Sequence, residues 1–216
     1  MFKANSFTIT IVSLLLLTFI VQGNINAQAK NFSQMENVNL RGGVSYIELN
    51  EKVFNNDEID LKSGFGLYIG GEYNIKEKIN LVGQYERYFM SDSWTDDQSG
   101  NTIEYNINLN SLVGLFSYNF MPINTTNVSL LGGPGYYFGE ISTSVKEIDY
   151  DVIADFKSSI GYKLGAEVEH RLKKNLNLNA NGFYRDLEME IAGQDYETDK
   201  IDFSGFEFSV GLNYKF

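Results

Sequence analysis

Apolar and polar residues alternate along most of the chain after residue 37. The clearest stretch is FKSSIGYKLGAEVEHR, residues 156–171, in which the even positions are mostly apolar and the odd positions hold glycines and charges. Because successive side chains of a strand point to opposite faces, this pattern predicts a strand with one apolar and one polar face. Eight segments show the pattern: 38–48, 64–75, 79–90, 102–120, 128–141, 156–171, 176–189 and 201–216.

The fourth segment changes the phase of its alternation part of the way along. Its apolar residues occupy odd positions as far as Leu109 and even positions from Leu112 onward. One extra residue in a strand restores a single apolar face, so we predict a β-bulge near Asn110–Ser111.

The connections between the segments are alternately long and short. The first, third, fifth and seventh are long and acidic, whereas the second, fourth and sixth are short turns. In hydrocarbon a sheet must close on itself to pair its backbone groups. An even number of strands, sorted connections and both ends at the short-turn end therefore predict an all-β fold, an eight-stranded antiparallel up-and-down transmembrane β-barrel. The alternative, a soluble secreted sandwich, predicts that the aromatic residues of the apolar faces are buried.

Aromatic residues recur near both ends of the predicted strands, where a membrane protein meets the water interface. For the short-turn end we expect a girdle of Tyr73, Tyr118, Phe120, Tyr214 and Phe216. For the long-loop end we expect Tyr46, Phe65, Phe89, Tyr105, Phe138, Phe156 and Phe206.

The first 29 residues differ from the rest and are predicted to be a signal peptide. Lys3 precedes an apolar run from about Phe7 to Val21, which is shorter than the roughly 20 residues of a spanning helix. Ala27-Gln28-Ala29 matches the small-residue cleavage site of signal peptidase. We expect residues 1–29 to be removed and residues 30–216 to form one barrel domain; an uncleaved anchor is the alternative.

The overall charge and the absence of cysteine exclude several kinds of function. The formal net charge is −11, which argues against a nucleic-acid partner. Without cysteine there is no disulfide framework, no thiolate metal site and no lipoprotein acylation site.

The last segment, GFEFSVGLNYKF, resembles the C-terminal assembly signal of bacterial outer-membrane barrels. The residues that carry the resemblance are Phe208, Val210, Leu212, Tyr214 and Phe216. With the signal peptide and eight strands, residues 30–216 resemble the small OmpX / OmpA-barrel group, an outer membrane protein beta-barrel domain. The resemblance implies insertion by the barrel assembly machinery, residence among outer-membrane lipid and lipopolysaccharide, and periplasmic N- and C-termini. It transfers no activity.

The polar faces would point into the barrel and carry charges of both signs. The predicted lumen charge network comprises Glu72, Glu86, Lys157, Lys163, Glu167, Glu169, Arg171, Arg185 and Glu207. Buried charges persist when paired, so the favoured interpretation is a network that plugs the lumen, with glycines making room for long side chains. The alternative is a path for ions or small solutes.

Catalysis is not expected. The chain has a single histidine, His170, and the residue two positions later is Leu172, so the His-x-Ser arrangement of lipid A deacylases is absent. Glu167 and Glu169 are better explained as salt-bridged lumen residues. We predict no catalytic residues, no cofactor and no metal site; a lipid-modifying hydrolase is the less favoured alternative.

The long acidic loops are the remaining functional surface. The candidates for contact with an extracellular partner are Trp94, Asp96, Asp97, Asp149, Tyr150 and Asp151, of which the aspartates are also suited to divalent cations. We therefore predict a monomeric, non-catalytic outer-membrane barrel with a structural or surface-interaction role in adhesion or envelope integrity. A narrow channel through the lumen is the alternative.

Overall fold

The structure is a computed structural model that describes residues 38–51, 53, 61–95, 101–123, 125–145, 150–192 and 200–216. The strands are β1 (Val38–Leu49), β2 (Ser63–Lys76), β3 (Ile79–Thr95), β4 (Thr102–Ile123), β5 (Thr126–Val145), β6 (Tyr150–Asp155), β7 (Ser159–Lys173), β8 (Leu176–Asp186), β9 (Glu188–Met189), β10 (Ile201–Asp202) and β11 (Gly205–Lys215). The predicted signal peptide lies outside the described residues. Within those residues, no helix is long and apolar enough to cross a membrane.

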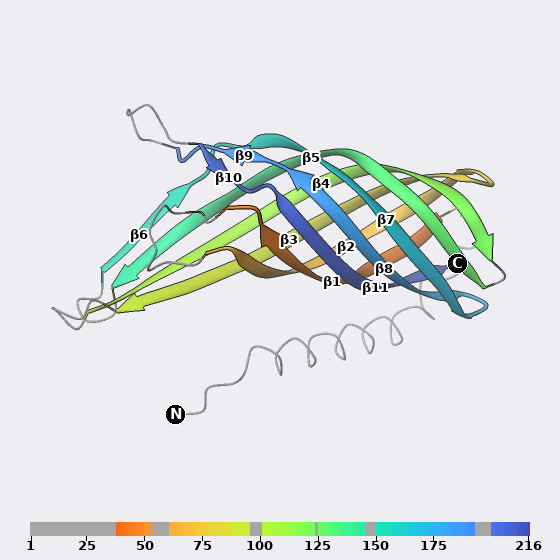
Figure 1. The fold of residues 1–216 in the computed structure, drawn as a ribbon, viewed down its shortest axis with the longest axis horizontal. Helices are drawn as coiled ribbons and strands as arrows, with labels where there is room; N and C mark the ends of the chain where they lie inside the picture. The colour runs from red at the N-terminus through yellow and green to blue at the C-terminus, as the bar shows by residue number, and fades with distance from the viewer. Residues whose placement is uncertain are drawn as a thin grey trace, which may run out of the picture.

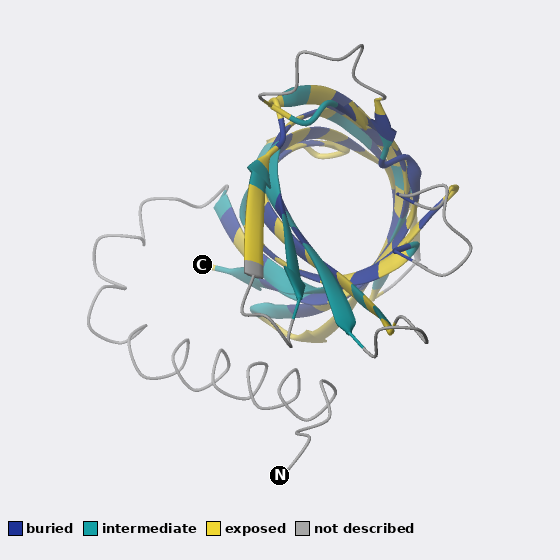
Figure 2. Cartoon of the chain, turned by 90° about the vertical axis from the view of Figure 1, so that its left-hand side faces the viewer, coloured by how far each residue is buried: buried dark blue, intermediate teal, exposed yellow. Residues whose placement is uncertain are grey.

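Eight strands close into an antiparallel ring, in the order β1-β2-β3-β4-β5-β7-β8-β11 (Figure 1). Strand β1 pairs with both β2 and β11, and β4 pairs with β5, so the ring has no free edge. Figure 2, which looks along the barrel from its long-loop end, shows the closed ring. The predicted eight-stranded up-and-down barrel is confirmed.

The strands are tilted because the pairing is staggered around the ring. Directly paired residues form a path around the ring that starts from Val38 on β1. The path crosses β2, β3, β4, β5, β7 and β8, reaches Phe206 on β11, and returns to β1 at Glu48, ten residues after its starting point. With ordinary strand spacing and rise, eight strands with this stagger tilt by about 40°. Such a barrel is just wide enough for side chains to fill.

The two ends of the barrel differ in their connections. Short connections join β2 to β3, β4 to β5 and β7 to β8 at one end, where the C-terminus also lies (Figure 1). At the opposite end the sheet extends beyond the ring: β6 pairs with β5, and β9 pairs with β10. The long connections are therefore gathered at this second end, as the sequence pattern predicts.

Alternating burial identifies the outer and inner faces of the barrel. In β7 the even positions point outward, and Ile160, Tyr162 and Leu164 are 65%, 62% and 69% exposed. Apolar side chains are exposed on the other ring strands as well, so the outer wall is apolar around the barrel. Figure 2 shows exposed and buried residues alternating along the strands. Such a surface is suited to contact with lipid.

The predicted bulge in β4 is wrong. Pairing between β3 and β4 is continuous from Ile79↔Tyr118 to Thr95↔Thr102, with no extra residue near Asn110–Ser111. Ile107 and Leu109 share the inward face with Ser111 and Val113. The alternation of apolar and polar residues changes phase because the inner face of β4 is apolar near the long-loop end. It does not change because an extra residue exchanges the two faces of the strand. An irregularity does occur lower in β4, between Asn119 and Met121, where it pairs with β5.

Most residues of the expected aromatic girdles are exposed, and Tyr46, Phe138 and Tyr214 are half-buried, but two residues at the long-loop end pack inward. Phe156 is buried, and Tyr105 is partly buried against the same core. Phe156 turns inward because it forms a bridge with Ile191 rather than continuing the alternation of β7. Both predictions were wrong for one reason: the barrel has an apolar core at this end.

Candidate functional site

The lumen near the short-turn end holds a cluster of ionic and amide side chains centred on Arg41. Its guanidinium lies 2.5 Å from Glu167 Oε2 and 3.6 Å from Glu72 Oε2, and all three side chains are buried. Asn213 donates to Glu72 at 3.3 Å and to Glu169 at 2.7 Å, so it joins two carboxylates from different strands. The cluster thereby links β1, β2, β7 and β11 across the lumen. We call it the lower cluster.

A second cluster, the upper cluster, lies farther toward the long-loop end and is centred on Lys163. The ammonium group lies 2.6 Å from both Glu86 Oε1 and Glu207 Oε2, and it also donates to the Tyr88 hydroxyl at 3.1 Å. That hydroxyl lies 2.8 Å from Glu86 and 2.7 Å from Glu207, and Ser111 donates to Glu86 at 2.7 Å. Every charge in this group therefore has several polar partners, as burial in a low dielectric requires.

Arg185 belongs to the same region but is satisfied differently. Its Nε and Nη2 donate to the carbonyl oxygen of Phe203 at 3.2 and 3.0 Å. Its guanidinium lies 5.1 Å from the centroid of the Tyr88 ring and 5.6 Å from that of Tyr137, which is cation–π geometry. This arginine thus joins the upper cluster to the apolar core above it.

An apolar core, here called the apolar cap, lies inside the barrel at the long-loop end. Its buried members are Ile47, Leu49, Val53, Leu61, Tyr88, Met90, Ile107, Leu109, Tyr137, Ile141, Phe156, Leu187, Met189, Ile201 and Phe203. A smaller apolar cluster, formed by Val82, Val113, Leu115, Leu131 and Phe183, packs on one side of the lumen below it. Reasoning from the sequence missed both, although Ile47 and Leu49 share the parity of Arg41 and Ser45.

Most of the residues predicted for the lumen network lie inside the barrel. The buried ones are Glu72, Glu86, Lys163, Glu167, Glu169, Arg185 and Glu207. The prediction is wrong for Lys157 and Arg171, whose side chains are exposed. Both lie where regular pairing breaks: Lys157 precedes β7, and the register with β8 shifts after Arg171. The central residue of the lower cluster, Arg41, is missing from the prediction, although the alternation of β1 places it on the inner face.

The loop candidates are only partly covered by the structure. Asp96, Asp97 and Asp149 lie outside the described residues, and only the backbone of Tyr150 is described. Asp151 is exposed on β6. Trp94 is partly buried and packs against the apolar cap, so it also stabilises this end of the barrel. Among the described residues, no group of His, Cys, Asp or Glu is arranged to hold a metal ion.

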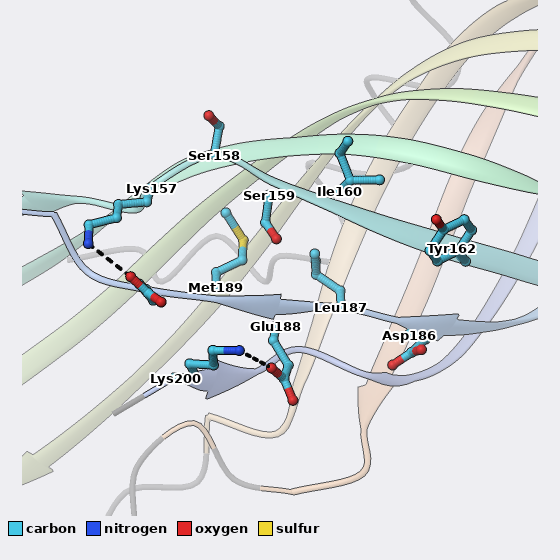
Figure 3. Close-up of a pocket in the computed structure, with 11 residues that line it drawn as sticks. Lys157, Ser158, Ser159, Ile160, Tyr162, Asp186, Leu187, Glu188, Met189 and Lys200 are labelled. Carbon is cyan, nitrogen blue, oxygen red and sulfur yellow. Dashed lines mark hydrogen bonds and ion pairs between the residues drawn. The ribbon is translucent and has the colours of Figure 1, made fainter. Parts of the chain in front are cut away.

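A pocket of about 520 Å³ lies beside the apolar cap, between the first residues of β7 and the segment from Asp186 to Glu190 (Figure 3). The β7–β8 ladder stops at Tyr162↔Asp186, and contact resumes at Phe156↔Ile191. Figure 3 shows two ion pairs near this gap, one of which joins its two walls. Lys157 lies 2.8 Å from Glu190, and Lys200 lies 2.9 Å from Glu188.

These exposed pairs shift the pKa of Glu190 and the pKa of Lys200. The pKa of Glu190 is lowered because Lys157 donates a hydrogen bond to it and attracts its charge. The pKa of Lys200 is raised because Glu188 accepts a hydrogen bond from it and attracts its charge. The polar rim of the pocket is therefore charged at neutral pH.

His170 lies on the outer face of β7. It is exposed at the short-turn end, and its Nδ1 lies 2.9 Å from the hydroxyl oxygen of Thr126. The neighbouring carboxylates of Glu167 and Glu169 point the other way, into the lower cluster, where Arg41 and Asn213 bind them.

Comparison with known proteins agrees with this architecture. The chain matches the model of the family described as outer membrane protein beta-barrel domain over residues 12–216. It is similar in structure to Neisserial surface protein A (NspA), with 16% sequence identity and a TM-score of 0.58 over 83% of this chain and 97% of that chain. It is also similar to the outer membrane protein OprG from Pseudomonas aeruginosa, with 14% identity and a TM-score of 0.60 over 84% of this chain and 96% of that chain.

At these identities the structural likeness shows the fold alone. A comparison with curated proteins gave no match. The family match covers nearly the whole chain and agrees with a closed eight-stranded ring whose outer wall is apolar. The chain therefore belongs to the outer membrane protein beta-barrel domain family, whose members are barrels of the bacterial outer membrane.

Proposed function

We propose that this barrel has a closed lumen, catalyses no reaction, and acts in adhesion or envelope integrity through its long-loop end. The observation that carries the proposal is the filling of the lumen by two buried ionic clusters beneath an apolar cap. A barrel filled in this way serves as a rigid membrane anchor for whatever its loops contact.

The closed lumen argues against the channel alternative. A permeating ion needs a continuous polar path, whereas the apolar cap offers it no ligand to replace its hydration shell. Below the cap, the carboxylates of Glu86 and Glu207 are already occupied by Lys163. Opening a path would require breaking these buried pairs, at a cost of several kcal/mol.

The contacts of the titratable groups support a role without catalysis. His170 is exposed and bonded to Thr126, and no carboxylate of the described residues pairs with it. Glu167 and Glu169 are held in ion pairs and amide hydrogen bonds. A histidine base is usually oriented by a carboxylate, which His170 lacks among the described residues, and the oxygens of Glu167 and Glu169 are occupied by Arg41 and Asn213.

The chemistry of the loop end indicates the kind of partner. Its connections are rich in Asp and Glu, with exposed Asp151 and Asp155 on β6 and exposed Val152 and Ile153 between them. Acidic groups around an apolar patch favour a basic protein surface, or an anionic one bridged by divalent cations. Asp96, Asp97, Asp149 and Tyr150 would add to the same surface.

Our proposal includes the processing and topology of the chain. Signal peptidase would cleave after Ala29, and the barrel assembly machinery would recognise the last strand through Phe208, Val210, Leu212, Tyr214 and Phe216. Both termini would then be periplasmic and the long loops extracellular. Because the closed ring has no free edge, the barrel would be a monomer.

Cysteine labelling in intact cells tests this topology directly, since the chain has no cysteine of its own. Thr95→Cys places a thiol at the long-loop end, and Glu77→Cys places one in the β2–β3 turn; both positions are exposed. We expect a membrane-impermeant maleimide to label Thr95→Cys in intact cells, and Glu77→Cys only after lysis. Labelling of Glu77→Cys alone in intact cells would overturn a surface role for the loops.

A further inference from the structure

A hollow of about 500 Å³ lies on the outer wall of the barrel, where β2, β3 and β4 run side by side. Its upper wall is formed by Ile69, Tyr85 and Leu112, which pair across the three strands and point outward. Its floor is backbone at Gly83 and Gly114, which pair directly with each other. An outward Cβ at either glycine would meet no atom within 4 Å, so the hollow is open space on the lipid side.

The next row of outward residues toward the long-loop end carries a positive charge. Arg87 pairs across the sheet with Leu67 on β2 and Asn110 on β4, and it is exposed. Its guanidinium lies 5.0 Å from the centroid of the Phe89 ring, which orients it on the outer wall. The ion pairs of the described residues do not include Arg87.

Further polar groups lie beside this arginine. The Tyr85 hydroxyl donates to Asn110 Oδ1 at 2.7 Å, so an amide of the arginine row meets a tyrosine of the upper wall of the hollow. Below the hollow the outward residues are again apolar and large: Tyr73, Leu81 and Phe116. From the loop end downward, the wall therefore presents a cation, two hydrogen-bonding groups, and then an apolar recess.

This order matches that of an anionic lipid, with its phosphate at the headgroup level and its acyl chains below. We propose that Arg87 and the hollow beneath it form a binding site for one phosphate-bearing lipid. An arginine at this level binds phosphate by charge-assisted hydrogen bonds while its stem lies along apolar surface.

The occupant we assign is lipid A, the phosphorylated glycolipid of lipopolysaccharide. This assignment rests on the proposed topology, which places the long-loop end, and hence Arg87, in the outer leaflet. Lipid A offers phosphate to Arg87, sugar hydroxyls to Asn110, and several acyl chains, of which one lies across Gly83 and Gly114. An anionic glycerophospholipid shares the phosphate and the chains but belongs to the other leaflet.

Lipid binding to the barrel purified from membranes in detergent tests the site. The probes are bisphosphorylated lipid A, dioleoylphosphatidylglycerol and dioleoylphosphatidylcholine, and the readout is lipid retained per barrel in native mass spectrometry. We expect Arg87→Gln to weaken retention of lipid A about tenfold. Gly83→Leu and Gly114→Leu, whose added Cβ atoms meet no atom within 4 Å, should weaken it by a similar factor because their side chains occupy the recess.

Matched variants control for charge and for bulk. Gly182→Leu adds the same side chain on the outer face of β8, where the nearest atoms are those of Phe208 at 3.7 Å, and Arg171→Gln removes an exposed arginine at the opposite end. Both should leave retention unchanged. A heat-dependent shift in gel mobility verifies that each variant is folded.

Equal retention of lipid A by Arg87→Gln and the unaltered barrel would overturn the site. Equal retention of phosphatidylglycerol and lipid A would overturn the assignment to lipid A. Both ends of the barrel are accessible in detergent, so a wrong topology would not affect this measurement. It would appear only in the cysteine labelling, which keeps the two proposals separately testable.

Discussion

At the residue scale, the charge balance of the upper cluster depends on the single side chain of Lys163. It is fully buried and neutralises Glu86 from β3 and Glu207 from β11, two strands on different sides of the ring. Replacing a buried pair by apolar groups is often neutral, whereas removal of one partner leaves a buried charge unpaired. The effect of a substitution therefore depends on whether its partners change with it.

We predict that Lys163→Met lowers the free energy of unfolding by about 3–5 kcal/mol, because two carboxylates lose their cation. Equilibrium unfolding in urea, with the barrel in lipid vesicles, measures the change. Lys157→Met, at an exposed position, should change it by less than about 0.5 kcal/mol. Adding Glu86→Gln and Glu207→Gln to Lys163→Met should recover much of the loss; a single variant as stable as the unaltered barrel would mean that water reaches the cluster.

The ion pair between Lys157 and Glu190 gives a prediction about pH. The pKa of Glu190 is lowered in the folded barrel, so the pair contributes above the ordinary glutamate pKa and is lost as pH falls through the lowered value. Lys157→Gln should raise the pKa of Glu190 toward its ordinary value, as followed by the carboxyl chemical shift in NMR. Lys200→Gln should have a smaller effect, since Lys200 pairs with Glu188 and acts on Glu190 only from a distance. An unchanged titration of Glu190 in Lys157→Gln would show that the pair does not form.

At single positions, strand parity predicted the side of the wall wherever pairing is regular. Lys163, Glu167 and Arg185 lie inside as their alternation indicates. Lys157 and Arg171 do not, because the sheet is irregular at both places, and irregularities of pairing leave no mark in the alternation of residue types. The same parity argument, applied to β1, would have placed Arg41 inside the barrel.

At the scale of elements, close approach of neighbouring strands explains several inward glycines. A Cβ on Gly165 of β7 would lie 2.2 Å from the carbonyl oxygen of Gly182 on β8 and 2.5 Å from the Phe183 ring. No side-chain rotation relieves a contact with backbone. Glycine at residue 165 therefore allows β7 and β8 to approach closely in the curved wall.

Gly165→Ala should destabilise the barrel by about 1–3 kcal/mol, because β7 and β8 must separate locally. Gly182→Ala is the matched control on the opposite face, where the added methyl makes only an ordinary contact with Phe208. The midpoint of the heat-dependent gel shift compares the two variants. If both variants shifted the midpoint equally, strand curvature would not be the reason for glycine at residue 165.

Strands whose inner face changes from polar to apolar along their length were the hardest to predict from the sequence. In β4 the odd positions run from Ile107 and Leu109 to Ser111 and back to Val113, all facing inward. We expected polar residues inside along the whole length, so the apolar stretch appeared to be outward and required a bulge. Apolar residues at the end of a barrel strand fit an inner cap as well as a lipid contact, and alternation alone does not distinguish them.

At the scale of the whole molecule, the sequence predicted the topology because membrane constraints are strict. Backbone pairing demands closure, and hairpin connections sort long loops and short turns to opposite ends. The contents of the lumen were less predictable. They depend on which inward side chains meet across the ring, such as Arg41 with Glu167, and the stagger that brings these two together is not encoded in any single strand.

We propose above all that paired charges and an apolar cap close the lumen of the barrel. Single-channel recording of the purified barrel in a planar bilayer, after its heat-dependent gel shift has shown it to be folded, tests this claim most directly. We predict that the folded barrel carries no steady current at any salt concentration. A steady, salt-dependent current that changes with Lys163→Ala or Glu167→Ala would contradict the account and make the lumen a path.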